Sequence, residues 1–280
     1  MSRIFANHWK DYELIDAGNE KKLERWGSVI TIRPERNAYF KSVLSEQEWK
    51  KKAHFEFVEK TANSGEWIEI KPVENRNWQI KFDQLVFKLK LTQFKHVGIF
   101  PEQRINWDFV SDNLKEGDRF LNLFGYTGAV SLAARNKGAD VFHCDSVKQI
   151  ITWGKENMES SGLSDIHWVQ EDAMKFAQRE VKRGSQYKGI IMDPPAFGLG
   201  ANKERWKIED KFPELLQLAK SLMQPNGFII INTYSPRLDI KSIKEIAGKV
   251  FTKNKIEVNR LCIESTSGKV IEYGELTRIN

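Results

Sequence analysis

The segment whose residue types could do chemistry most directly is 193–197, Asp-Pro-Pro-Ala-Phe, which follows the apolar run 187–192. Each proline lacks an N–H and fixes φ at about −65°, so the chain cannot continue a sheet ladder or start a regular helix here. The carboxylate and the two proline carbonyls, which have no local donor, can accept hydrogen bonds from an amino group, and the aromatic ring can stack on a flat heterocycle. This pattern favours a site for an exocyclic amine on a base. A proline-rich turn that merely ends a strand is the alternative.

A second segment is typical of nucleotide binding. The short apolar run 120–124 leads into Gly125-Tyr126-Thr127-Gly128, after which residues 129–134 have a helical pattern. A strand, a glycine turn and a helix open a βαβ unit, and glycines let the backbone approach a ligand closely. The dinucleotide fingerprint needs a third glycine, which is missing here, and glycines that serve the turn alone are the alternative.

Acids follow three predicted strands in succession. Asp145 ends the run 139–145, Asp172 ends the run 166–172, and Asp193 follows the run that begins at residue 187. Any one of these acids could be a helix N-cap, but parallel strands present their carboxyl ends at one edge, where open α/β sheets bind ligands. Asp145 would suit a ribose diol and Asp172 an adenine amino group.

These motifs together resemble class I S-adenosylmethionine-dependent methyltransferases, within the group related to large-subunit ribosomal RNA methyltransferases. The resemblance covers residues 92–280 and includes 97–104, Val-Gly-Ile-Phe-Pro-Glu-Gln-Arg, which is similar to the family's Gly-x-Phe-x-(Asp or Glu)-Gln-Arg segment. It implies S-adenosylmethionine as cofactor and no metal. The cofactor-binding residues that it implies are Phe100, Gln103, Asn122, Phe124, Gly125, Tyr126, Thr127, Gly128, Asp145, Ser146, Glu171, Asp172, Ala173 and Asp193. The catalytic residues that it implies are Asp193, Pro194, Pro195 and Phe197, with Phe197 and Tyr234 facing the substrate.

One departure from the family bears on the mechanism. Members that methylate carbon 5 of cytosine use a cysteine in a Ser-Cys-Ser-like segment, whereas the matching segment here, 233–235, is Thr-Tyr-Ser. Cys144 and Cys262 lie elsewhere and do not replace it. An N-methyl acceptor needs no covalent catalysis, because its nitrogen attacks the methyl group in line. The sequence therefore predicts methyl transfer to a base nitrogen of ribosomal RNA. A small-molecule or protein amine as acceptor, a nicotinamide-dependent oxidoreductase and a non-catalytic RNA-binding module remain alternatives.

The elements that must position these residues predict an α/β fold with two domains. Residues 95–280 alternate strand and helix, which predicts a Rossmann-like, doubly wound, mostly parallel seven-stranded sheet with an antiparallel edge strand near the carboxyl terminus. Residues 1–94 predict a small β-rich domain that could serve as a substrate platform. There, period-two alternation in 78–82 and 85–91 predicts a hairpin. A helix is expected over 45–59, with Ser45 and Glu48 as its capping box.

Composition and charge agree with an RNA partner without requiring one. The 280 residues include 44 basic and 38 acidic side chains, for a net charge of +6 and a pI near 9.1. Five of the nine tryptophans fall before residue 95 among lysines, so they form either a stacking surface for single-stranded RNA or the core of a small sheet. Two cysteines, no long apolar run and no signal peptide predict a cytoplasmic protein without disulfides.

Overall fold

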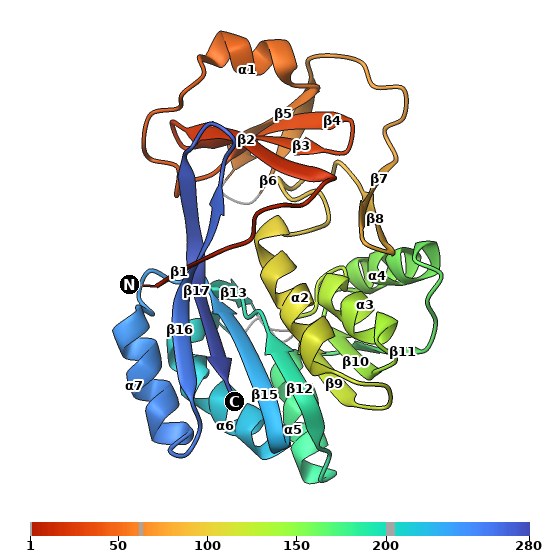
Figure 1. Cartoon of the computed structure of the whole chain (residues 1–280), viewed down its shortest axis with the longest axis vertical. Helices are drawn as coiled ribbons and strands as arrows, with labels where there is room; N and C mark the ends of the chain where they lie inside the picture. Colours follow the sequence, from red (N-terminus) through yellow and green to blue (C-terminus); the bar gives the residue numbers. More distant parts are fainter. Residues whose placement is uncertain (1, 62–63, 200–204) are drawn as a thin grey trace. The chain divides into compact units, whose positions relative to one another are not determined.

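The computed structural model describes residues 2–61, 64–199 and 205–280, and the chain divides into two compact units (Figure 1). Unit 1 consists of Met1–Ile4, Ile105–Leu261 and Gly274–Asn280, and unit 2 of Phe5–Arg104 and Cys262–Tyr273. Unit 2 thus combines the amino-terminal part of the chain with a segment from near its carboxyl end. A functional division at residues 94 and 95 stays a prediction.

A sheet of eight strands forms the centre of unit 1, in the order β1-β16-β17-β15-β12-β9-β10-β11. Its strands are β1 (Arg3–Phe5), β9 (Arg119–Leu123), β10 (Asp140–Asp145), β11 (Ile166–Gln170), β12 (Tyr187–Met192), β15 (Met223–Thr233), β16 (Ile256–Glu264) and β17 (Val270–Ile279). The five strands from β15 to β11 pair in parallel, and β17 pairs antiparallel with β15. The predicted doubly wound, mostly parallel sheet is confirmed, and the short strand β1 adds an eighth strand to the expected seven.

The helices of unit 1, apart from the first, pack in two groups. They are α2 (Arg104–Asn113), α3 (Ala129–Asn136), α4 (Lys148–Ser160), α5 (Ala173–Lys182), α6 (Ile208–Leu222) and α7 (Ile240–Val250). Helix α6 packs against both α5 and α7, whereas α3 packs against α4. Phe176 of α5 and Phe212 of α6 are buried with Ile190 of β12 and Ile229 of β15 in one apolar cluster. Strands that are covered by helices on both faces have nearly continuous apolar sequences, so the apolar runs in this chain predict the positions of the parallel strands.

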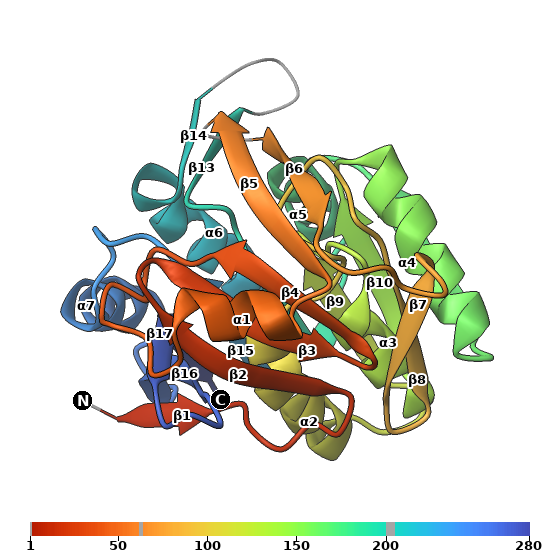
Figure 2. The same cartoon turned by 90° about the horizontal axis from the view of Figure 1, so that it is seen from above.

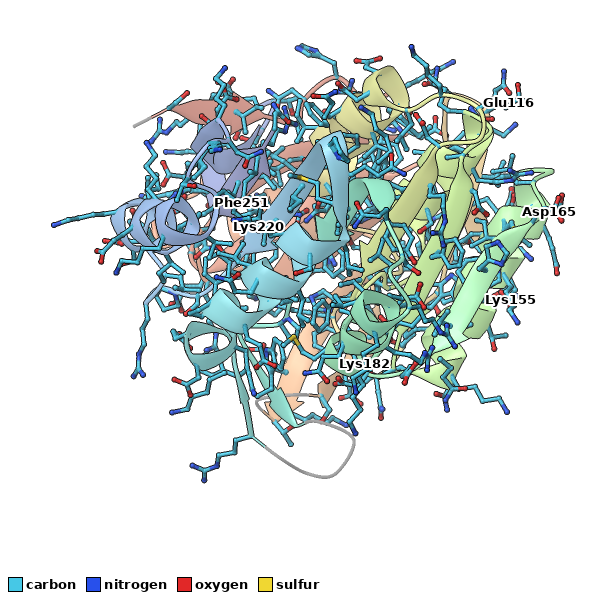
Figure 3. All side chains as sticks on the ribbon, turned by 90° about the horizontal axis from the view of Figure 1, so that it is seen from below. Glu116, Lys155, Asp165, Lys182, Lys220 and Phe251 are labelled. Atoms are coloured by element: carbon cyan, nitrogen blue, oxygen red, sulfur yellow. The ribbon has the colours of Figure 1, made fainter. Side chains whose placement is uncertain are left out.

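The two edges of this sheet carry different residues. Figure 3 looks onto the edge where the strands begin, with Glu116 and Asp165 just before β9 and β11, and Lys182 at the end of α5, which precedes β12. The acids that the sequence singles out follow the strands, so they lie at the opposite, carboxyl edge.

Unit 2 is built on a five-stranded sheet in the order β2-β3-β4-β5-β6. Its elements are β2 (Tyr12–Gly18), β3 (Lys21–Trp26), β4 (Val29–Pro34), α1 (Glu46–Lys52), β5 (Phe55–Thr61), β6 (Ser64–Glu69), β7 (Trp78–Phe82), β8 (Leu85–Leu89) and the 3-10 helix η1 (Pro101–Gln103). Strands β7 and β8 form the predicted hairpin. Figure 2 shows α1 lying across the strands β2 to β4.

Helix α1 begins as predicted but ends earlier. Glu48 N donates to Ser45 Oγ (3.3 Å) and Ser45 N donates to Glu48 Oε2 (2.8 Å), which completes the capping box. The helix ends at Lys52 and not at residue 59, so its predicted length is wrong. Residues from 55 onward instead form β5, because this segment pairs with β4 on one side and β6 on the other.

The tryptophans of unit 2 form core rather than surface. Trp9, Trp26, Trp49 and Trp78 are at most 7% exposed. Trp67 is partly buried, with its ring centroid 5.2 Å from that of Phe57. The interpretation of these rings as core is therefore confirmed for the four buried tryptophans, and these four cannot stack on RNA bases.

Unit 2 also buries a group of charges. Arg33 donates from Nε and Nη2 to the two carboxylate oxygens of Glu24, at 2.6 and 2.8 Å. Lys22 pairs with Glu35 at 3.2 Å. Near them, Glu102 is only 4% exposed, and within the described part of the chain its Oε2 has no hydrogen-bond partner. Burial raises the pKa of Glu102 to about 7, although the neighbouring Lys22 acts in the opposite direction.

Candidate active site

The parallel strands of unit 1 bring the predicted site residues to one edge. Leu123 of β9 is in register with Cys144 of β10 and with Met192 of β12, and Asp145 is in register with Gln170 of β11. The turn after β9, Asp145, Asp172 and Asp193 therefore follow strand ends that lie next to one another. The strand order reverses at β9, with β10 and β11 on one side and β12 and β15 on the other. Such a switch point is where open α/β sheets bind ligands.

The turn between β9 and α3 has an unusual backbone. Phe124 and Tyr126 have φ of 59° and 51°, and Gly128, which precedes α3, has φ of 85°. Left-handed backbone at residues other than glycine is uncommon and clusters at binding sites, where the surrounding structure holds it. The turn is also closed internally, since Gly128 N donates to Gly125 O at 3.1 Å.

Position 125 has room for glycine alone. A Cβ atom there would lie 2.4 Å from Cε1 of His143. This imidazole is fully buried, and its Nδ1 lies 3.0 Å from Ser131 Oγ, which also accepts from Asn122 Nδ2 at 2.9 Å. Burial lowers the pKa of His143 to about 3, so the ring is neutral. The predicted cofactor residue Asn122 thus supports the turn from beneath.

Ser131 and His143 were missed by sequence reasoning. In the sequence, Ser131 of α3 and His143 of β10 are marked only by being polar side chains among apolar neighbours.

Asp145 is fixed by backbone donors of two loops. Its Oδ2 accepts from Tyr126 N at 3.0 Å and its Oδ1 accepts from Val147 N at 2.9 Å. Burial raises the pKa of this carboxyl above its ordinary value, against the effect of these N–H groups. Backbone N–H groups, including that of Ser146, take part of the acceptor capacity of this carboxylate, and its acceptance from the ribose hydroxyls stays a prediction. Ser146, which follows it, is exposed.

The next strand end carries a cap and an ion pair. Asp172 is the N-cap of α5, and its Oδ1 accepts from Lys175 N at 3.0 Å. Glu171 pairs with Arg179 at 2.6 Å, and Ala173 is buried. Asp172 therefore has the local capping role that the sequence offered as an alternative. Within the described ranges no hydrogen bond to its second oxygen is formed, and an adenine amino group as donor to that oxygen stays a prediction.

Buried contacts with α4 and β11 surround the turn at Thr127 and Gly128. Thr127 is 1% exposed, and its carbonyl accepts from Asn157 Nδ2 of α4 at 3.2 Å. The indole of Trp168 in β11 would lie 3.2 Å from a Cβ at Gly128 and 2.6 Å from one at Gly154. The small residues at these positions let the α4 backbone and the turn approach this ring closely.

Phe100 and Gln103 belong to unit 2, where Gln103 N donates to Phe100 O at 3.0 Å. The ring of Phe100 lies 5.1 Å from that of His96. Their role in cofactor binding stays a prediction.

The Asp-Pro-Pro-Ala-Phe segment forms the expected turn after β12. Asp193 N donates across the switch point to Leu123 O at 3.3 Å. The Pro195 carbonyl has a donor from outside the turn, because Trp206 Nε1 lies 2.6 Å from it. Sequence reasoning missed Trp206, which lies 11 residues away and is part of β14 (Arg205–Lys207).

The end of the turn leads into a small hairpin. Strand β13 (Phe197–Leu199) pairs antiparallel with β14, with Phe197 opposite Lys207. The Phe197 side chain is 58% exposed, and Arg205 is also exposed. An exposed aromatic ring beside basic residues is suited to a base and its phosphates.

The end of β15 carries no thiol. Thr233 and Ser235 are buried there, Tyr234 is half-buried, and Ser235 Oγ donates to Glu209. Cys144 lies in the core, where its Sγ is 3.4 Å from Glu171 O, and burial raises its pKa far above the ordinary thiol value. Cys262 is buried in unit 2. Neither cysteine has the exposed thiol that a nucleophile needs.

These residues fit S-adenosylmethionine. The left-handed turn lies directly before α3, whose amino end favours negative charge such as a carboxylate, and Asp145 suits the ribose diol. When bound, the cofactor supplies an electrophilic methyl group on sulfur. The individual contacts stay predictions.

Within residues 2–61, 64–199 and 205–280, no three His, Cys, Asp or Glu side chains form a group that could hold a metal ion. In the same ranges, no helix is both long and apolar enough to span a membrane.

Comparison with known proteins agrees with this geometry. A family model described as S-adenosylmethionine-dependent methyltransferase matches residues 50–247. The crystal structure of the SAM Dependent Methyltransferase from Agrobacterium tumefaciens is 32% identical, with a TM-score of 0.90, over 99% of this chain and 96% of that one.

Among curated proteins, the chain is similar to Ribosomal RNA large subunit methyltransferase K/L from Shewanella frigidimarina, with 32% identity over 57% of this chain. The protein of that name from Pseudoalteromonas translucida is 28% identical, also over 57% of this chain. The match covers 23% of the length of each of these two relatives. The family model spans most of this chain, and the Agrobacterium structure matches nearly its full length. The chain therefore belongs to the S-adenosylmethionine-dependent methyltransferase family.

Proposed function

We propose that this methyltransferase transfers the methyl group of S-adenosylmethionine to a base nitrogen of ribosomal RNA, in the cytoplasm. The K/L relatives, which are named for ribosomal RNA, support the substrate class, although the match spans only 23% of their length. The excess of 44 basic over 38 acidic residues is compatible with a polyanion.

The observation that carries this proposal is the turn at residues 193–197. It joins a carboxylate, the Pro194 carbonyl and an exposed Phe197 ring at the switch point of the sheet. Trp206 holds the turn through the Pro195 carbonyl, so the acceptors are positioned before a substrate arrives. Acceptors that are fixed in advance need little reorganisation when charge develops on the attacking nitrogen.

In the proposed reaction, the nitrogen lone pair would form the new N–C bond as the methyl–sulfur bond breaks, S-adenosylhomocysteine would leave, and the nitrogen would lose its proton to solvent. Asp193 and the Pro194 carbonyl would accept hydrogen bonds from the amine and stabilise its developing positive charge. Phe197 would stack on the base. No step requires a thiol, which agrees with the burial of Cys144 and Cys262.

The test is methyl transfer from tritiated S-adenosylmethionine to RNA, protein and metabolite fractions of a strain that lacks the gene, followed by mass spectrometry of the labelled nucleoside. We expect label in ribosomal RNA on a base nitrogen. Asp193→Ala should lower turnover far more than cofactor affinity, and Cys144→Ser and Cys262→Ser should both remain active. A methyl group on carbon 5 of a pyrimidine, or label confined to the protein or metabolite fraction, would contradict the proposal.

A further inference from the structure

A loop of unit 2 exposes an aromatic ring that the methyltransferase site does not use. The loop consists of residues 35–44, between β4 and α1, and is called here the Tyr39 loop. The side chain of Tyr39 is 84% exposed, more than any other exposed large hydrophobic residue that the structure describes. Its ring lies 6.0 Å from that of Phe40, which is partly buried.

The loop backbone is held in place along its length. Asn19 N donates to Phe40 O at 2.7 Å, and Glu20 N donates to Ala38 O at 2.8 Å. At Gly18 the β2 backbone approaches so closely that a Cβ atom would lie 2.1 Å from Ser42 N. The exposed ring therefore stands on a backbone that is fixed rather than free.

Asp16 anchors the end of the loop. Its Oδ2 accepts from Leu44 N at 2.8 Å and from Trp49 Nε1 of α1 at 2.9 Å, and its Oδ1 accepts from Ser267 Oγ at 2.6 Å. Burial alone would raise the pKa of Asp16, but the hydrogen bonds outweigh burial and lower it. This carboxylate thus joins the loop to α1 and to the turn between β16 and β17.

The charges around Tyr39 are mainly positive. Arg36 and Lys41 are exposed and form no ion pair within the described ranges, and Lys269 Nζ lies 5.6 Å above the Phe40 ring. Of the neighbouring acids, Glu35 is paired with Lys22 at 3.2 Å, and Glu20 is exposed in the adjoining turn. By contrast, Lys50 of α1 is paired with Glu46 at 3.0 Å, so its charge is partly neutralised within the unit.

We propose that the Tyr39 loop binds single-stranded RNA, with a base stacked on Tyr39 and phosphates at Arg36 and Lys41. A single exposed ring that is flanked in the sequence by the exposed cations Arg36 and Lys41 offers little apolar area to a protein partner, but it matches a base and its flanking phosphates. Because the loop backbone is already held in place, RNA binding would order few further groups of the protein, and this keeps the entropic cost of binding low. This inference rests on the proposed RNA substrate, and it replaces the buried tryptophans as the RNA-contacting aromatic surface of unit 2.

The test is fluorescence anisotropy of a short labelled single-stranded RNA with the full chain at several salt concentrations. Tyr39→Ala should weaken binding about 5- to 150-fold, which corresponds to roughly 1–3 kcal/mol for a lost stacking contact, while Tyr39→Phe should bind as the parent does. Arg36→Ala with Lys41→Ala should reduce the salt slope by about 1.4, since each phosphate contact on a single strand contributes about 0.7. As a matched control, Lys50→Ala with Lys60→Ala, which removes two ion-paired lysines, should leave that slope unchanged.

The results separate this inference from the proposed function. If the parent methylates RNA but Tyr39→Ala binds RNA with parental affinity, the loop is not an RNA site although the function stands. If the parent neither binds nor methylates RNA, both proposals fail. If Tyr39→Ala instead changes the mass of the protein in sedimentation without changing RNA binding, the loop contacts a second copy of the chain, and the RNA inference is overturned.

Discussion

Replacing Asp145 tests the cofactor site most directly. Its two oxygens hold Tyr126 N and Val147 N at 3.0 and 2.9 Å, and we expect them also to accept the ribose hydroxyls. Charge-assisted hydrogen bonds of this kind contribute roughly 1.5–3 kcal/mol, so Asp145→Ala should weaken S-adenosylmethionine binding about ten- to hundredfold. Asp145→Asn should weaken it less, because the amide oxygen keeps part of the acceptor capacity.

The binding should also depend on pH in a predictable direction. The ionised carboxylate accepts from hydroxyls, whereas its protonated form gives up acceptor capacity. Because burial raises the pKa of Asp145 above 3.8, affinity should begin to fall at a higher pH than an ordinary aspartate would cause. In Asp145→Asn this part of the pH dependence should be absent.

The assay is isothermal titration calorimetry with S-adenosylmethionine over a pH series, together with a thermal unfolding curve for each variant. Asp140→Asn is the matched control, since Asp140 begins the same strand and forms surface contacts with His167 (2.8 Å) and Arg119 (3.6 Å). It should cost at most about 1 kcal/mol of stability and leave affinity unchanged. Parental affinity in Asp145→Ala, or an equal loss in Asp140→Asn, would refute the assignment.

Three further outcomes follow from the geometry. Gly125→Ala should destabilise the protein by about 1–3 kcal/mol in chemical denaturation, because the new methyl group would overlap the buried imidazole of His143. Gly248→Ala, which has open space around the new methyl group, should be neutral or stabilising. Equal effects of the two substitutions would contradict the overlap. Trp206→Phe should lower turnover without changing cofactor affinity, since it removes the donor to the Pro195 carbonyl, and unchanged steady-state kinetics would show that this contact is dispensable. Glu102→Gln should raise the free energy of unfolding at about pH 8 by up to about 3 kcal/mol. The pKa of Glu102 rises from 4.5 to about 7 on folding, so in the parent this carboxyl destabilises the folded protein as the pH increases through this interval. The gain should vanish near pH 4, and a less stable variant at pH 8 would contradict the reasoning.

Much of unit 1 could be predicted because its signals are local. Each parallel strand is covered by helices and has an apolar sequence, and each acid ends its strand or follows it within two residues. Parallel topology then places Asp145, Asp172 and Asp193 at one edge whatever the details of packing. The capping box of α1 was equally predictable, since it requires only Ser45 and Glu48 three residues apart.

Features that depend on a distant partner were not predictable. The end of α1 was misplaced because residues from 55 onward gain more from pairing with β4 and β6 than from continuing the helix. The donor to the Pro195 carbonyl comes from Trp206, on the far side of a hairpin. The imidazole under Gly125 comes from the neighbouring strand.

By itself, the sequence determined the α/β class, the methyltransferase motifs and the order of the acids along the sheet edge, because hydrophobic periodicity and turn chemistry act between near neighbours. Only the tertiary structure decided which aromatic rings are buried and which are exposed. Trp26 and Trp49 face the core of unit 2, while Tyr39 projects from a loop that Asp16 and the β2–β3 turn hold. Exposure of a ring is set by what packs against it, and those partners come from segments far along the chain.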